Sequence, residues 1–453
     1  MAFNKELLLE LIEAKNYSAF IREIDEQNPV DIADLLASLP DEKQLSVFRM
    51  IKKDVAADIF AELDTDIQER IIKAASDKEI SAVIEDLFVD DAVDMLEELP
   101  ANMVARILQI AKPETRAVIN KFLSYPEDSV GNIMTSEYID LRENMTVEQA
   151  LRHIRKKGHD RETVLIAYVT DKRRVLHGTI NLETLLFSDD EDIIGDIMDR
   201  DCISIRTHDD KEDGVALISK YGLLALPVVD MENRLVGIVT FDDAIEVIEE
   251  ENTEDIEIMA AILPSDKPYL KTSVFEIWKN RIPWLLILMF SSTFTGQIIT
   301  GFESALSAFP LLIAFIPMLM GTGGNSGGQA SATIVRGLAI DEIQLRDILQ
   351  VIWKELRVAT LCGVALAIGN FIKIILLDNL LFGNNVDYLS AFVISLTLLA
   401  TVIIAKIVGG ILPIVAKKIG FDPAVMASPF ITTIVDAITL LIYFAIATLM
   451  LGI

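Results

Sequence analysis

The chain has 453 residues, enough for several domains, and carries a formal net charge of −29. From Arg281 to the end nine basic and nine acidic residues cancel, so the first 280 residues hold all of this charge. Such acidity opposes nucleic-acid binding and favours binding of soluble cations, although it could also serve solubility alone. The two cysteines are far apart in the sequence and indicate neither a disulfide framework nor a zinc motif.

Residues 1–130 are expected to form an all-α domain. The start, MAFNKELLLELIEAKN, lacks the basic region and long apolar core of a signal peptide, which predicts a cytoplasmic location for the N-terminal half. IADLLASLP, AADIFAELD and AVDMLEELP recur with an apolar period near 3.6 residues. This recurrence predicts helical hairpins stacked into a small superhelix, with Asp90, Asp91 and Asp94 close together on one helix.

Residues 131–250 contain an internal repeat, in which VGNIMTSEYIDL matches IGDIMDRDCISI and LIAYVTDKRRVLHGTIN matches LPVVDMENRLVGIVT. Each copy predicts a short strand, a helix, two strands and a helix. This resembles a pair of α/β CBS domains, a Bateman module that often binds adenine nucleotides. Thr240 and Asp243 stand at that family's ribose position, where the first copy has Asn181 and Thr184. The resemblance implies one nucleotide site, for example for ATP, or a purely structural dimerisation module.

Residues 251–280 are expected to form an acidic connecting helix between this module and the membrane. Across 242–258 the carboxylates of Asp243, Glu246, Glu250 and Glu254 would share one helical face. Like charges one turn apart destabilise a helix, and a divalent ion bridging them to other carboxylates would relieve the repulsion. A solvated acidic linker is the alternative.

Residues 281–453 predict a membrane domain of five spans. The apolar segments are long enough to cross about 30 Å of hydrocarbon. The loops after the second and fourth segments hold Lys and Arg, and those after the first and third hold none, which places the basic loops inside and the C-terminus outside. The chain is therefore expected to be a multi-pass protein of the inner or plasma membrane. The segments are 282–305, 309–336, 358–377, 389–415 and 423–451.

The second span contains GTGGNSGG, residues 321–328. Each glycine would cost a soluble helix about 1 kcal/mol relative to alanine. In a membrane, small residues let helices approach closely, and bare glycines expose carbonyl groups that can bind the water around an ion. The stretch lacks the Gly-Lys-Ser/Thr ending of a phosphate-binding loop. Tight packing without an ion path remains the alternative.

Asp436 lies near the middle of the fifth span. A carboxylate at this depth costs about 3 kcal/mol on insertion scales. The polar residues Ser428, Thr432, Asp436, Thr439 and Tyr443 recur every three or four positions and form one stripe, which should face protein or water. Two copies of the carboxylate near a dimer axis could hold a largely hydrated Mg²⁺, because hard divalent cations prefer oxygen ligands. A structural contact, for example with Lys406, is the alternative.

The order of these parts, with the GGN motif, resembles the MgtE family of magnesium channels. The resemblance implies a homodimer with a two-fold pore, whose connecting helix closes the pore when Mg²⁺ binds between acidic cytosolic domains. It implies that Asp436 is the pore acid and that Asp422 helps to hold the closed state. Gly328 and Ser428 differ from the residues common at these positions in the family. Co²⁺, Mn²⁺ and Ca²⁺ are therefore further candidate ions for the pathway. The implied sensor ligands are Asp90, Asp94, Asp243, Glu246, Glu251, Glu254 and Asp255.

The sequence thus predicts a gated Mg²⁺-permeable homodimer in the lipid bilayer that binds no nucleic acid. An ion-coupled secondary transporter of divalent cations is the alternative, with Asp436 as the carrier group. A membrane-tethered nucleotide sensor is a third interpretation. An enzyme is not expected, because no nucleophile–base pair or catalytic metal cluster is apparent in the sequence.

Overall fold

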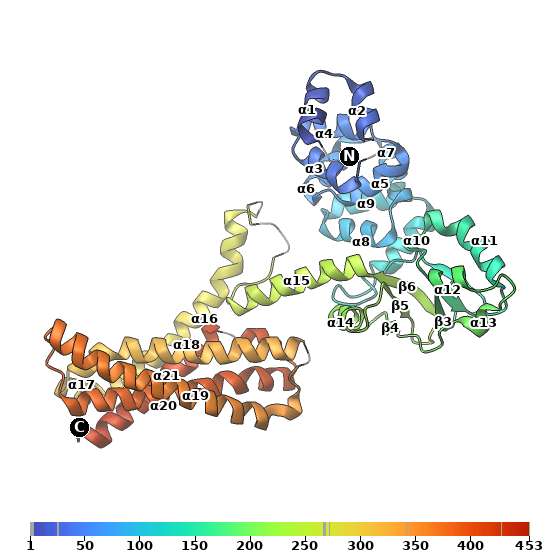
Figure 1. The fold of residues 1–453 in the computed structure, drawn as a ribbon. Coiled ribbons are helices and arrows are strands. Elements are labelled where there is room, and N and C mark those ends of the chain that lie inside the picture. Colours follow the sequence, from blue (N-terminus) through green and yellow to red (C-terminus); the bar gives the residue numbers. More distant parts are fainter. Residues whose placement is uncertain are drawn as a thin grey trace. The chain divides into compact units, whose positions relative to one another are not determined.

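The fold is seen in a computed structural model, which describes residues 4–24, 27–265, 269–270, 272–340, 342–426 and 428–452. The chain divides into two compact units, Met1–Ile248 and Glu249–Ile453. In Figure 1 the first unit runs from blue to green and the second from yellow to red. The predicted multidomain fold, with an all-α domain, a CBS pair and a helical apolar region, is confirmed.

The N-terminal part of the first unit is all helix, as the recurring motifs predicted. IADLLASLP forms α3, AADIFAELD forms α5 and AVDMLEELP forms α8, and each buries its apolar side chains in one shared core. A capping box between Ser76 and Glu79 begins α7 by satisfying backbone donors that a helix start leaves unpaired. The helices are α1 (Lys5–Glu13), α2 (Tyr17–Ile24), α3 (Pro29–Ala37), α4 (Asp41–Phe48), α5 (Lys53–Ala61), α6 (Thr65–Ala74), α7 (Asp77–Asp86), α8 (Val89–Glu98), α9 (Ala101–Ile110) and α10 (Pro113–Phe122).

The internal repeat forms two three-stranded sheets of the same topology. In each sheet the first strand runs parallel to the second, and the second antiparallel to the third. The first copy contains β1 (Ile139–Leu141), α11 (Val147–Lys157), η1 (Gly158–Asp160), β2 (Ile166–Thr170), β3 (Leu176–Asn181) and α12 (Leu182–Phe187). The second contains α13 (Ile194–Ile197), β4 (Ile205–Arg206), α14 (Lys211–Tyr221), β5 (Ala225–Val229), β6 (Leu235–Thr240) and the start of α15 (Phe241–Met259).

The N-terminal helices and the second sheet share one hydrophobic core. Buried residues of this core come from α8 to α10, from β4 to β6 and from the first turns of α15. A hydrogen bond of 3.0 Å from Asn132 Nδ2 to Glu97 Oε2 also joins the two parts. The acidic side chains of α8 are therefore held in a defined position relative to the start of α15.

The stretch expected to be one connecting helix contains the end of α15 and the beginning of another helix, α16 (Val274–Gly301). Between the two helices the backbone N–H of Leu263 donates to the Asn280 carbonyl, and that of Ser265 donates to Glu257. Residues 266–268 and 271 of the expected helix lie outside the described residues.

The second unit contains long helices at all five expected spans. Four regions are long and apolar enough to cross a membrane, Val274–Gly301, Leu345–Leu381, Tyr388–Lys418 and Pro423–Leu451. The remaining long helix, at the second expected span, is α18, whose centre is occupied by glycine and amide residues. The elements after α16 are α17 (Glu303–Ala308), α18 (Leu311–Ala339), η2 (Leu345–Asp347), α19 (Ile348–Lys373), the π-helical η3 (Ile374–Leu381), α20 (Tyr388–Lys418), η4 (Pro423–Met426) and α21 (Ser428–Leu451).

Candidate ion-binding sites

The glycine-rich stretch is the centre of α18, and its glycines bring two other helices into close contact. A Cβ atom at Gly323 would lie 2.8 Å from the Thr401 methyl carbon of α20 and 2.9 Å from Thr439 Oγ1 of α21. A Cβ atom at Gly409 of α20 would overlap the carbonyl oxygen of Gly327. The glycines therefore serve close packing of α18, α20 and α21, one of the two roles that the sequence left open.

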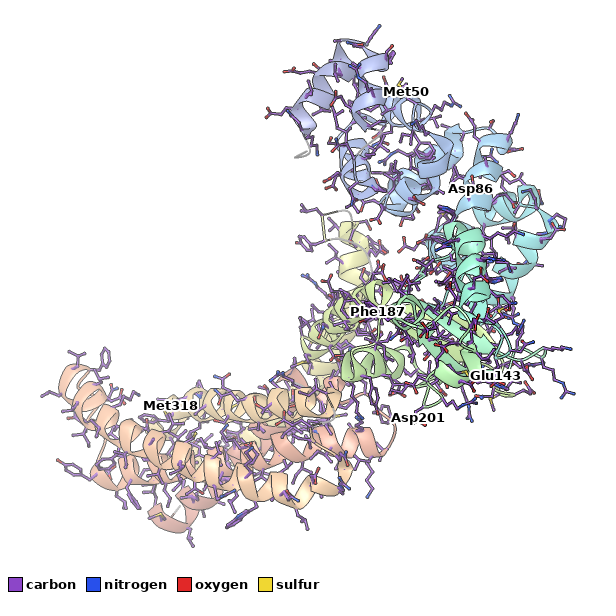
Figure 2. All side chains as sticks on the ribbon, turned by 45° about the vertical axis from the view of Figure 1, so that its right-hand side comes forward. Met50, Asp86, Glu143, Phe187, Asp201 and Met318 are labelled. Carbon is purple, nitrogen blue, oxygen red and sulfur yellow. The ribbon has the colours of Figure 1, made fainter. Side chains whose placement is uncertain are left out.

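The polar stripe of α21 faces protein, as its spacing predicted. The Tyr443 hydroxyl is buried and donates to the Leu312 carbonyl of α18 at 3.0 Å, and the Thr432 side chain is next to Gly324. Thr439 is buried beside Gly323. The Ser428 side chain lies outside the described residues. In Figure 2, Met318 is labelled on α18 just before the glycine-rich stretch.

Asp436 is half-buried, and one of its carboxylate oxygens has no partner. Among the described residues Asp436 Oδ1, Thr439 Oγ1 and Thr401 Oγ1 are buried without a hydrogen-bond partner. No ion pair joins Asp436 to Lys406 in the described part of the chain, because the Lys406 ammonium donates instead to Gln329 Oε1 at 3.5 Å. Buried oxygens without partners are costly, so these positions suit a hydrated cation or water.

One face of α18 exposes amide side chains at mid-helix. Asn325 and Gln329, one turn apart, are both solvent-exposed in the single chain. An amide facing lipid at this depth would lose its hydrogen bonds to water. This face therefore requires a polar environment, either water or another protein surface.

An acidic cluster lies in the first unit where α8 meets the start of α15. Burial, followed by the charges of neighbouring carboxylates, raises the pKa values of Asp90, Asp91, Asp94 and Glu162. Burial raises the pKa of Asp91 to about 7 and that of Glu162 to about 8, and raises that of Asp90 well above its usual range. This acidic cluster consists of Asp90, Asp91, Asp94, Glu162, Asp243 and Glu246.

The cluster brings together four predicted sensor residues and adds two. Asp90, Asp94, Asp243 and Glu246 were expected, whereas Glu162 was not. Nothing around Glu162 in the sequence marks it, because it precedes β2 and only the tertiary fold brings it near α8. Asp91 was noted beside Asp90 and Asp94 but not counted as a ligand.

The cluster contains a buried carboxylate oxygen without a hydrogen-bond partner, but its carboxylates are not gathered into a ligand shell in the described part of the chain. Asp90 is 7% exposed and its Oδ1 has no hydrogen-bond partner. Across the described residues, no three histidine, cysteine, aspartate or glutamate side chains are grouped closely enough to hold a metal ion. Like charges repel when no cation lies between them, which is consistent with carboxylates that do not lie close together.

The remaining predicted acids belong to the second unit. Asp255 of α15 lies near Asp422, which precedes η4. Burial raises the pKa of Asp255, and the charges of Asp422 and then Glu251 raise it further. Asp422 Oδ1 also accepts the Ala424 backbone N–H at 2.7 Å and begins η4. Glu254 immediately precedes Asp255 on α15 and is exposed. The two groups of predicted ligands thus lie in different units.

Thr240 and Asp243, the expected ribose-binding pair, are hydrogen-bonded to each other. The Thr240 hydroxyl and backbone N–H both donate to Asp243 Oδ2. Thr240 is buried at the end of β6, and Asp243 lies in the first turn of α15. Asp243 therefore belongs both to this pair and to the acidic cluster.

Comparisons with known proteins agree with this arrangement. Family models match an MgtE intracellular N domain at residues 27–128, CBS domains at 130–190 and 194–250, and a divalent cation transporter domain, MgtE, at 316–446. The magnesium transporter MgtE of Thermus thermophilus is 34% identical over 98% of each chain. The chain belongs to the MgtE family. The MgtE of Bacillus subtilis is 32% identical over 94% of this chain and 92% of its own.

A solved structure also resembles the first part of this MgtE-family chain. The cytosolic domain of the Mg²⁺ channel MgtE in complex with ATP has a TM-score of 0.51 and 33% identity, and covers 54% of this chain and 100% of its own. The predicted family and CBS pair are thereby confirmed. The relatives are named as transporters rather than enzymes.

Proposed function

We propose that the chain is a Mg²⁺-permeable homodimeric channel, gated by cytosolic Mg²⁺ bound at its acidic cytosolic groups. The observation that carries the proposal is the unpartnered carboxylate oxygen of Asp436 on α21, the helix that packs closely against the glycines of α18. The names of the full-length relatives supply Mg²⁺ as the cargo. Carboxylate, hydroxyl and carbonyl oxygens suit a hard divalent ion that keeps most of its water.

The exposed amide face of α18 supports a homodimer. Asn325 and Gln329 need a polar environment within the bilayer, and a second copy of the chain around a water-filled path would provide it. Asp436 keeps part of its surface exposed in the single chain, which a path between two copies would use. Two carboxylates facing one axis would repel each other unless a cation lay between them.

Gating is assigned to the two acidic groups. In the first unit Mg²⁺ would be held by Asp90, Asp94, Asp243 and Glu246, together with Asp91 and Glu162. In the second unit it would be held by Asp255 and Asp422, with Glu251 and Glu254 on the same helix. Mg²⁺ favours the closed state only if that state binds it more tightly than the open state does.

Currents across planar bilayers test the channel proposal. With Mg²⁺ as the carrier, we expect unitary currents far above the turnover of a coupled carrier, and lower open probability as Mg²⁺ on the cytosolic side increases. Flux without resolvable unitary currents would favour the coupled transporter. An open probability that does not change with the cytosolic Mg²⁺ concentration would contradict the proposed gating.

Mg²⁺ binding to the acidic cluster is expected to strengthen as the pH rises from 6 to 8. Asp91 and Glu162 have pKa values raised to about 7 and about 8, so binding must displace protons from them. Raised carboxyl pKa values stabilise the metal-free fold at low pH, and that stabilisation is lost as the pH rises through 7 to 8. Calorimetric titration of the full chain in nanodiscs, in two buffers of different ionisation enthalpy, would measure the released protons. D91N/E162Q should flatten the pH dependence, and a pH-independent affinity in the wild type would contradict it.

ATP binding is expected at the second CBS copy, as in the solved relative's complex with ATP. Thr240→Val would remove the hydroxyl that orients the Asp243 carboxylate, and should weaken ATP binding about 10-fold, the effect of losing one buried hydrogen bond. Thr184→Val, at the exposed position of the first copy that corresponds to Asp243, is the control and should leave affinity unchanged. Equal effects of the two variants would contradict the assignment.

A further inference from the structure

Lys406 is a charged residue in the middle of α20 that the proposed ion path does not use. It is 5% exposed, and its ammonium donates to Gln329 Oε1 of α18 at 3.5 Å. In the described part of the chain no carboxylate oxygen lies within ion-pair distance of it. A buried ammonium held by one long hydrogen bond to a neutral amide is costly, so its position calls for a role beyond packing.

Gly327 places Lys406 at the same level of the bundle as Asp436. A Cβ atom at Gly327 would lie 3.2 Å from the Ala405 carbonyl oxygen of α20 and 3.3 Å from Val435 Cγ2 of α21. Lys406 and Asp436 are the next residues on those two helices. The backbones of Lys406 and Asp436 therefore flank a single three-helix contact, and in the described part of the chain their side chains form no ion pair.

Every helix packed around Lys406 carries a group that its charge can influence. Gln329 of α18 holds the ammonium, and Asp436 of α21 lies in the same layer. On α19, Glu355 packs against Gly410, one turn beyond Lys406, and its Oε2 is buried without a hydrogen-bond partner. The two helices that flank α20 at this point, α19 and α21, thus each carry a carboxylate with an unpartnered oxygen.

We propose that Lys406 determines how tightly the path binds divalent cations, acting as a fixed positive charge that weakens binding in the Asp436 layer. This inference rests on the proposed channel function. When the path is empty, the ammonium offsets the buried carboxylate of Asp436, and when a divalent ion arrives it opposes the ion's binding. Conduction requires binding that is weak enough for the ion to leave. By donating to Gln329 Oε1, the ammonium also occupies one of the two lone pairs with which that oxygen could accept hydrogen bonds from the ion's hydration shell.

The test compares Mg²⁺ flux into proteoliposomes containing wild type, Lys406→Met, Lys406→Arg and Lys417→Met. At a separation of about 20 Å, roughly two helix spacings, a unit positive charge lowers the affinity for a divalent ion. The decrease is about 2-fold in a water-like dielectric and about 20-fold at the effective dielectric constant of about 20 found near protein surfaces. We expect K406M to lower the half-saturating Mg²⁺ concentration by that factor, and K406R to stay near wild type. K417M is the matched control, because Lys417 also lies on α20 and donates to α18, at the Leu338 carbonyl, 3.0 Å away.

Several outcomes would overturn the role of Lys406. These are an unchanged half-saturating concentration in K406M, equal shifts in K406M and K406R, or an equal shift in K417M. Lys406→Gln, which is neutral but can still bond to Gln329, keeps the test valid if the methionine variant does not assemble, and should show the same decrease. Wild-type liposomes that carry no divalent cation would instead overturn the channel function itself.

Discussion

Replacing Asp436 by asparagine is expected to abolish Mg²⁺ flux, by about 100-fold or more, while the protein still assembles. The side chain keeps its size but loses the charge that attracts a divalent ion in a medium of low dielectric constant. Removing the charge should also relieve the cost of its half-buried, unpartnered oxygen, so thermal stability should not fall. Flux into proteoliposomes, followed with an internal Mg²⁺-sensitive dye, measures the loss.

Two variants serve as controls for Asp436→Asn. Asp436→Glu keeps the charge and should retain part of the flux, whereas Glu342→Gln removes an exposed carboxylate from the loop after α18 and should change nothing. Size-exclusion chromatography establishes that each variant is assembled. Undiminished flux in D436N would remove Asp436 from the ion path and leave its buried charge as a structural feature.

Gly409→Ala is expected to destabilise the membrane helices and thereby to stop transport. A single methyl group at this position would overlap the Gly327 carbonyl oxygen, which belongs to a helix backbone and cannot rotate away. The helices α18 and α20 would have to separate, with a cost of about 1–3 kcal/mol for overpacking. The measurement is the temperature at which detergent-solubilised protein loses its monodisperse chromatographic peak, with flux at permissive temperature as the second reading.

Gly369→Ala is the matched control for Gly409→Ala. Gly369 lies within α19, and nothing occupies the space within 4 Å of the Cβ atom that it lacks. Alanine has the higher helix propensity, so this variant should be neutral or slightly stabilising. If G409A melted at the same temperature as G369A, the tight contact between Gly409 and Gly327 would not determine the packing of these helices.

Local patterns in the sequence were sufficient to predict the elements. The 3.6-residue period of IADLLASLP and its repeats predicted α3, α5 and α8, and the duplicated strand–helix–strand–strand–helix pattern predicted both CBS copies. The spacing from Thr432 to Tyr443 predicted a helix face turned toward protein, which Thr439 and Tyr443 confirm by their burial. These predictions succeed because helical and strand periodicities depend on neighbours a few residues apart.

Tertiary structure decided which distant groups meet. Glu162 and Asp91 join the acidic cluster only because α8 packs against the start of α15 and the first CBS copy lies close by, and no spacing in the sequence encodes that distance. The sequence left open whether Lys406 pairs with Asp436, and in the folded chain its ammonium donates to Gln329 of α18 instead. Residues far apart in the chain acquire their distances from side-chain packing, which local periodicity does not contain.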